Sequence, residues 1–200
     1  EEFITLRTAR RWLPQFLTWA AERDITPELD ISTLPRREPT ISTSEEHLEN
    51  VIRTLTTDRT IPLDARLAAL LIAVYGLPAT KTLALRRRQL RDESDGLDLH
   101  IGDRPLTLPA PITLLAREQL DLRPDADDDA WLFPGRLPGQ PLDPQYLSLR
   151  LRPLGTSISA LQNTARFRLA GAVPAKVLAD VLDFGVATFE NYARLAGGTR

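Results

Sequence analysis

The sequence contains no cysteine and no methionine, and it has only two histidines, His47 and His100. The absence of cysteine excludes disulfide bonds and thiolate metal sites. Two histidines far apart in the sequence argue against a zinc site and against a histidine-based catalytic triad. We therefore expect no metal and no cofactor. Because methionine is absent, we also expect the sequence to be a fragment or a processed product.

Long hydrophobic runs are absent as well. The longest candidate, Ala65 to Leu77, is shorter than the roughly 18 residues that a membrane-spanning helix needs, and it begins beside Arg66. The chain starts with Glu1 and Glu2 rather than with the basic segment of a signal peptide. We expect a cytoplasmic protein without a membrane partner. Its 200 residues, 42% of them hydrophobic, suffice for one packed domain and part of another.

The order of patterns predicts three parts. Hydrophobic residues at helical spacing in 6–23 indicate an amphipathic helix, and we assign residues 1–30 to the end of an N-terminal helical domain. Prolines, serines and threonines in 24–44 are typical of a loop, and we assign 31–44 as a linker. Residues 45–200 form the main domain.

The main domain is predicted to be mainly α with a small antiparallel β-hairpin. Ser42 and Glu45 have the spacing of a capping box that starts a helix, and Gly76 ends a buried helix that begins near Ile61. Alternating hydrophobic residues in 97–109, with Gly102-Asp103 between them, predict the hairpin. The acidic run 125–129 lacks the spacing of a calcium loop, so we interpret it as a solvated loop. Further helices are expected over 80–85, 111–120, 143–153, 158–171, 174–182 and 187–196.

Several phrases in this order resemble the tyrosine recombinase (phage integrase) family over about residues 45–196. They are Tyr75-Gly76-Leu77-Pro78 after a buried helix, Ile101-Gly102-Asp103-Arg104 on the hairpin, Leu132-Phe133-Pro134, Ser159-Ala160-Leu161-Gln162 on a helix, and Val181-Leu182-Asp183-Phe184 followed by Tyr192. The resemblance implies an integrase-like catalytic domain. It also makes the N-terminal helix similar to the end of the family's core-binding domain.

The chemistry of the family depends on residues that this sequence mostly lacks. A tyrosine oxygen attacks a DNA phosphodiester, two arginines stabilise the transition state, and a lysine or histidine protonates the leaving oxygen. Only Tyr192 matches, at the nucleophile position. The arginine positions hold Pro78 and Gln162, the hairpin lysine position holds Asp103, the first histidine position holds Ser159, and the late histidine position holds Phe184 or Asp183.

Three cations near these positions are candidates for compensating residues. Lys81 lies about one helical turn after Pro78, Arg104 follows Asp103, and Arg166 lies one turn after Gln162. We interpret each as a surface charge in preference to a catalytic group. We therefore predict that the domain is inactive and that Tyr192 is half-buried on a terminal helix with its hydroxyl at the surface.

Duplex DNA is the expected partner, although the net charge of −2 is low for a DNA-binding protein. The resemblance also implies a possible homo-oligomer through the C-terminal helix. The arginines on the family's DNA-facing surface would be Arg86, Arg87, Arg88, Arg91, Arg150, Arg152, Arg166 and Arg168. For each of them a solvated helix face is an equal alternative to phosphate contact.

Three other functions remain open from the sequence. Residues Pro174 to Ala196 also fit a helix-turn-helix regulator with 187–196 as its recognition helix. The fold could instead serve as a protein interaction scaffold that does not bind DNA. The third alternative is an active site-specific recombinase with a rebuilt active site.

Overall fold

The computed structural model describes residues 16–27, 43–94 and 96–197, and the chain divides into two units, Glu1–Glu38 and Pro39–Arg200. In the first unit residues 16–21 are helical and residues 22–26 form turns. Phe16 and Trp19 stack with their ring centroids 5.8 Å apart, and the Arg23 guanidinium lies over the Trp19 ring. Residues 6–15 of the predicted helix 6–23 lie outside the described residues. So do residues 28–42 of the predicted loop 24–44, which include most of the linker 31–44.

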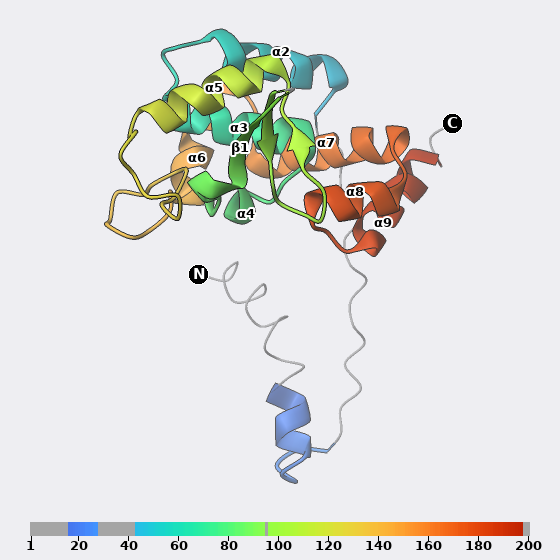
Figure 1. Ribbon diagram of the computed structural model, residues 1–200. Helices are drawn as coiled ribbons and strands as arrows, with labels where there is room; N and C mark the ends of the chain where they lie inside the picture. Colours follow the sequence, from blue (N-terminus) through green and yellow to red (C-terminus); the bar gives the residue numbers. More distant parts are fainter. Residues whose placement is uncertain (1–15, 28–42, 95, 198–200) are drawn as a thin grey trace. The chain divides into compact units, whose positions relative to one another are not determined.

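The second unit is mainly helical with one small sheet (Figure 1). Its helices are α2 Glu45–Thr57, α3 Leu63–Tyr75, α4 Ala79–Leu83, α5 Ala110–Asp121, α6 Pro144–Leu151, α7 Ile158–Ala172, α8 Ala175–Leu182 and α9 Val186–Gly197, with the 3₁₀ turns η1 Arg87–Gln89 and η2 Arg152–Leu154. Its strands are β1 Leu90–Glu93, β2 Gly96–Leu99 and β3 Leu106–Thr107, in the antiparallel order β1-β2-β3. The predicted fold class is confirmed.

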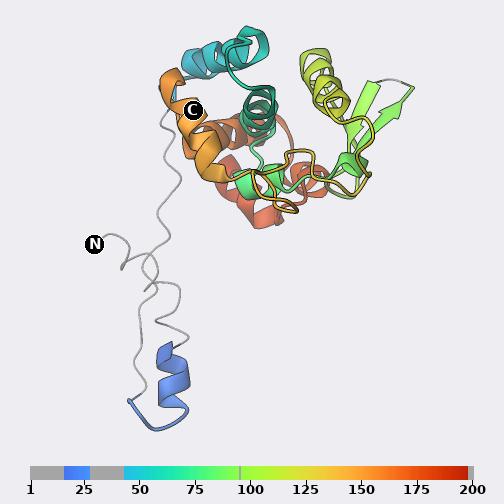
Figure 2. The ribbon, with the colours of Figure 1, turned by 90° about the vertical axis from the view of Figure 1, so that its left-hand side faces the viewer.

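Helix α3 is the centre of the core because nearly all of its side chains are hydrophobic. It packs against α2, α4, α5, α6 and α7. Figure 2 shows α5 and the sheet on one side of α3 and α2 on the other. Gly76 ends α3 in the left-handed conformation, with φ of 66°, as the sequence predicted.

Two local predictions need correction. The N-cap of α2 is Ser44, whose side chain accepts a hydrogen bond from the His47 amide, whereas Ser42 lies outside the described residues. The sheet has a third strand, β1, which pairs with β2 from Leu90↔Leu99 to Glu93↔Gly96. The polar residues of β1 give no hydrophobic alternation, because only Leu90 is buried.

The connection between β2 and β3 is also longer than the predicted two-residue turn at Gly102-Asp103. It covers residues 100–105, and it leaves the sheet to contact α8. The Asp103 amide donates a hydrogen bond to the Asp180 carbonyl at 2.9 Å. A Cβ atom on Gly102 would collide with the Asp180 carbonyl oxygen, so glycine is required for this close approach.

Candidate functional site

Tyr192 lies on α9, which packs against α7 and α8. Its side chain is only 5% exposed, and its hydroxyl donates a hydrogen bond to Oδ1 of Asn163 on α7 at 2.9 Å. The prediction of a half-buried side chain is therefore wrong, whereas the hydrogen bond of its hydroxyl to Asn163 is only partly buried. Phe189, one turn earlier, is buried in the same way, because α9 turns this hydrophobic stripe toward its neighbouring helices.

Arg166 reaches into the same region from α7. Its Nε donates to the Gly76 carbonyl at 2.8 Å, and the Gln162 amide, oriented with its oxygen toward the guanidinium, accepts from Nη1 at 3.1 Å and from Nη2. Burial lowers the pKa of Arg166, whereas its hydrogen bond with Tyr192 acts in the opposite direction. The interpretation of Arg166 as a surface charge is wrong, because the guanidinium lies beside the Tyr192 hydroxyl.

Lys81 reaches the turn between α8 and α9 from helix α4. Its ammonium group donates to the Leu182 carbonyl at 3.3 Å and to the Asp183 carbonyl at 2.8 Å, and it forms an ion pair with the Asp183 carboxylate at 2.5 Å. Lys81 thus satisfies carbonyl groups that the end of a helix leaves without partners. The interpretation of Lys81 as a surface charge misses this role.

The ring of Phe184 contacts both cations. The Arg166 guanidinium lies over it at 4.6 Å from the centroid, and the Lys81 ammonium at 5.5 Å. Phe189 packs edge-on against the same ring at 5.4 Å. A cation over an aromatic face is attracted by the negative potential of the ring. The aromatic side chain at the late histidine position therefore fills the space next to both basic groups.

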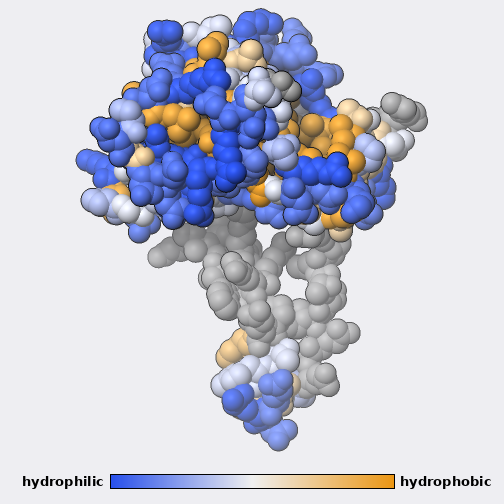
Figure 3. All heavy atoms as spheres, in the orientation of Figure 1, coloured by the Kyte–Doolittle hydropathy of each residue, from blue (hydrophilic) through white to orange (hydrophobic). Residues whose placement is uncertain are grey.

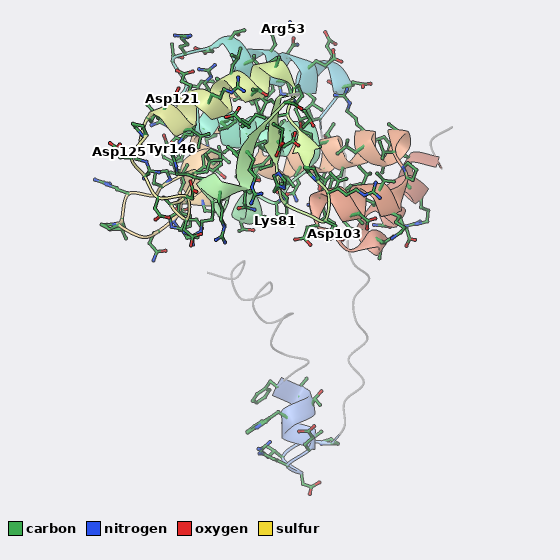
Figure 4. The ribbon with its side chains drawn as sticks, viewed as in Figure 1. Arg53, Lys81, Asp103, Asp121, Asp125 and Tyr146 are labelled. Atoms are coloured by element: carbon green, nitrogen blue, oxygen red, sulfur yellow. The ribbon has the colours of Figure 1, made fainter. Side chains whose placement is uncertain are left out.

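Pro78 and Asp103 make local structural contacts, and Ser159 and Arg104 are exposed. Pro78 precedes α4, and its carbonyl accepts hydrogen bonds from the hydroxyl and the amide of Thr82. Asp103 contacts α8 through its backbone, as described above. The structure thus gathers Lys81, Gln162, Arg166, Phe184 and Tyr192. Figure 4 shows Lys81 and Asp103 among the side chains of this part of the domain.

The arginine cluster 86–88 holds the acidic loop. Arg86 lies over the Trp131 ring at 3.1 Å from the centroid and donates to the Asp129 carbonyl. Arg87 donates to the carbonyl of Leu120. Arg88 forms an ion pair with the Asp129 carboxylate at 2.6 Å. These contacts give all three arginines a structural function.

The other arginines proposed for DNA binding differ in how far their charge is already paired. Arg168 on α7 forms an ion pair with Glu45 at 3.3 Å. Arg150 lies over the Tyr146 ring at 5.0 Å, where its charge remains exposed. Arg91 and Arg152 are exposed on β1 and η2. Three arginines of this set are therefore exposed and form no ion pair with the described residues: Arg91, Arg150 and Arg152.

Asn163, which binds the Tyr192 hydroxyl, was not among the predicted site residues. One signal was available: Gln162, Asn163 and Arg166 form a polar group within a helix that is otherwise rich in hydrophobic residues. Because residues four apart lie on the same face of a helix, Gln162 and Arg166 could have been paired. Asn163 points toward α9 because of the way α7 and α9 are rotated against each other. The sequence pattern alone does not predict this rotation.

Within residues 16–27, 43–94 and 96–197, no three histidine, aspartate or glutamate side chains form a group that could hold a metal ion. The helices in these ranges are all too short or too polar to cross a membrane. The surface toward the viewer in Figure 3 is mostly hydrophilic, with hydrophobic side chains in small groups. The exposed large hydrophobic residues of the second unit are Leu114, Leu122, Leu137, Leu149, Val177 and Val186.

Comparison with known proteins identifies the fold. No family model and no curated protein matches the chain. Among solved structures, the XerH site-specific recombinase bound to difH substrate in a post-cleavage complex matches 95% of the chain with a TM-score of 0.70 at 18% identity. The Tn1549 transposon integrase in complex with a circular intermediate DNA matches 95% with a TM-score of 0.62 at 15% identity. The XerA recombinase matches 87% with a TM-score of 0.57 at 18% identity.

These likenesses cover only part of the other proteins. The chain spans 63% of the XerH chain, 74% of the integrase chain and 66% of the XerA chain. At these identities the similarity establishes the architecture. The chain has the tyrosine recombinase fold, as the order of its sequence phrases predicted.

Proposed function

We propose that this chain is a DNA-binding protein on a tyrosine recombinase fold and that it does not cleave DNA. One observation carries the proposal: the Tyr192 side chain, at the nucleophile position, is only 5% exposed, and its hydroxyl is bound to Asn163. The guanidinium beside it, that of Arg166, is held by Gly76 and Gln162. The surroundings of this tyrosine are those of a packed side chain.

The replaced residues support the same conclusion. Phosphodiester cleavage by a tyrosine needs charge stabilisation on the phosphate and a proton for the leaving oxygen. The two arginine positions hold Pro78 and Gln162, and the hairpin lysine position holds Asp103. Loss of one such stabilising group costs on the order of 3 kcal/mol, or about a hundredfold in rate. Arg166 and Lys81 would have to replace all of them while they remain bonded to the Gly76 carbonyl and to Asp183.

DNA binding is supported by the fold and by the free arginines. XerH and the Tn1549 integrase are described as complexes with DNA, and the present chain shares their architecture. Arg150 and Arg152 offer guanidinium groups to phosphates, and so does the exposed Arg91, whose Nε also donates a long hydrogen bond of 3.4 Å to the Arg88 carbonyl. Arg86, Arg87, Arg88 and Arg168 are engaged within the domain. A net charge of −2 predicts weak binding that salt abolishes.

Cleavage is tested with a suicide DNA substrate, which traps a covalent protein–DNA adduct. We expect no adduct from the wild-type chain. An adduct that forms with the wild type and disappears in Tyr192→Phe would overturn this half of the proposal and establish an active recombinase with a rebuilt site.

Binding is tested by gel shift on duplex DNA at about 50 mM salt and at rising salt concentration. We expect Arg91→Ala, Arg150→Ala and Arg152→Ala each to weaken binding and to reduce the salt slope by about one. Arg117→Ala is the matched control, because Arg117 forms an ion pair with Asp92. Absence of any shift with micromolar protein at low salt would reject DNA binding and favour an interaction scaffold.

A further inference from the structure

The turn between α8 and α9, residues Asp183, Phe184 and Gly185, contacts two cations, Lys81 and Arg166, of which Arg166 lies beside Tyr192. The Asp183 carboxylate pairs with Lys81, and the Phe184 ring lies against both Lys81 and Arg166. Lys81 and Arg166 come from different helices, α4 and α7, and are separated by 85 positions in the chain. The fold therefore brings two positive groups together and covers them with one short segment of its own chain.

We propose that this turn is an autoinhibitory plug that keeps a phosphate of DNA away from Lys81 and Arg166. The inference rests on the proposed function, because DNA is the ligand that the plug would exclude. The Asp183 carboxylate acts as an internal anion, which a phosphodiester would have to replace at Lys81. The Phe184 ring takes up the space beside the guanidinium.

The backbone of the turn fits a segment that can move. Asp183 adopts φ of 51°, a left-handed conformation that costs a non-glycine residue free energy. A Cβ atom on Gly185 would meet no atom within 4 Å, so there is open space beside this residue. The ion pair is partly open to solvent, since the side chains of Lys81 and Asp183 are 28% and 66% exposed. Displacement of the turn would relieve this left-handed conformation, but it would break the hydrogen bonds of Lys81 to the Leu182 and Asp183 carbonyls.

The plug also connects the cation pair to Tyr192. Phe184 packs edge-on against Phe189, and Phe189 and Tyr192 are buried on the same helix, α9. Lys81 additionally holds the carbonyl ends of α8. Withdrawal of the turn would thus free Lys81 from Asp183 while α9 remains anchored by its contacts with α7.

The test compares Asp183→Asn with the wild type in two binding assays. Asparagine has nearly the same size and also tolerates the left-handed conformation, so the variant keeps the fold, which circular dichroism checks. We expect Asp183→Asn to bind duplex DNA about three- to tenfold more tightly at low salt, because an exposed ion pair contributes up to roughly 1 kcal/mol. We also expect inorganic pyrophosphate to raise the Tm of Asp183→Asn more than that of the wild type.

Two variants control for charge and for location. Asp92→Asn removes the same charge from another exposed ion pair, that with Arg117, and should change DNA affinity by less than about twofold. Lys81→Met combined with Asp183→Asn should lose the gain in both assays. An equal gain in Asp92→Asn, or a gain that survives the loss of Lys81, would overturn the plug.

The pyrophosphate assay separates this inference from the proposed function. If no variant binds DNA but Asp183→Asn gains pyrophosphate binding that depends on Lys81, the plug is supported and the proposed DNA-binding function is rejected. If the variants bind DNA equally and pyrophosphate has no effect on their Tm, the plug is rejected and DNA binding stands.

Discussion

The Nε atom of Arg166 donates a hydrogen bond to the carbonyl oxygen of Gly76 at 2.8 Å, although the two residues are 90 positions apart. The bond ties the middle of α7 to the end of α3 at the residue where α3 turns left-handed. The aliphatic part of Arg166 lies so close to Gly76 that a Cβ atom there would stand 2.5 Å from Cγ of the arginine. The glycine that ends the central helix thus also positions the guanidinium beside Tyr192.

Gly76→Ala should therefore destabilise the domain and displace Arg166. The left-handed backbone costs alanine about 1–2 kcal/mol, and the collision adds to that cost, for a total of about 2–4 kcal/mol. Chemical denaturation measures the loss in the free energy of unfolding.

Gly155→Ala is the matched control for this prediction. Gly155 has the same φ of 66°, but its added Cβ would meet its nearest neighbour, Cε1 of His47, at an ordinary 3.6 Å. It should lose only the backbone contribution of about 1–2 kcal/mol. Equal losses in the two variants would show that Arg166 does not pack tightly on Gly76.

Gly102→Ala tests the contact of the β2–β3 connection with α8. The added Cβ would collide with backbone carbonyl oxygens of Asp180 and Val181, which cannot turn aside as a side chain can. We expect a loss of about 2–4 kcal/mol and faster amide exchange at Asp103, whose N–H binds the Asp180 carbonyl. Gly171→Ala, inside α7 with no atom near its Cβ, should instead gain up to about 1 kcal/mol. A neutral Gly102→Ala would contradict the observed contact.

The sequence predicted most of the second unit because its signals are local. The hydrophobic run that forms α3, the stop at Gly76 and the hydrophobic stripes of α5 and α7 all depend on neighbouring residues. Strand β1 was not predicted, because three of its four side chains are exposed and polar. Its pairing with β2 is stabilised by backbone hydrogen bonds, which do not require particular residue types.

The candidate site was predicted only in part, since it depends on contacts between distant segments. The order of the phrases along the chain placed Tyr192, Gln162 and Phe184 at positions that correspond to catalytic positions of the recombinase family. It did not show that Arg166 would reach Tyr192, or that Asp183 would pair with Lys81 102 positions away. Such contacts depend on how α4, α7, α8 and α9 are rotated against each other, and helical periodicity carries no information on that rotation.

Arg86→Ala should loosen the acidic loop without removing a DNA contact. Its guanidinium stacks on Trp131 and binds the Asp129 carbonyl, and loss of a partly desolvated cation–π pair costs about 1–2 kcal/mol. We expect faster amide exchange in residues 127–131 and an unchanged salt slope in DNA binding. Arg53→Ala is the control, because Arg53 is exposed on α2 and bonds only to Asn50 of its own helix among the contacts described (Figure 4). A reduced salt slope in Arg86→Ala would instead make Arg86 a phosphate contact.

The last prediction concerns stability at high pH. Burial raises the pKa of Tyr75, at the end of α3, to about 12, whereas a tyrosine in the unfolded chain titrates near 10. Between about pH 10 and 12 the folded state therefore binds more protons than the unfolded state, and the free energy of unfolding falls as pH rises, by up to about 1.4 kcal/mol per pH unit. Below pH 10 this contribution is fully present.

Tyr75→Phe isolates this contribution, because phenylalanine keeps the ring and removes the ionising hydroxyl. Urea denaturation at a series of pH values should give a shallower fall in stability above pH 10 for Tyr75→Phe than for the wild type. The same slope in Tyr75→Phe and the wild type would mean that the Tyr75 hydroxyl reaches solvent, which would contradict its buried position at the end of the central helix.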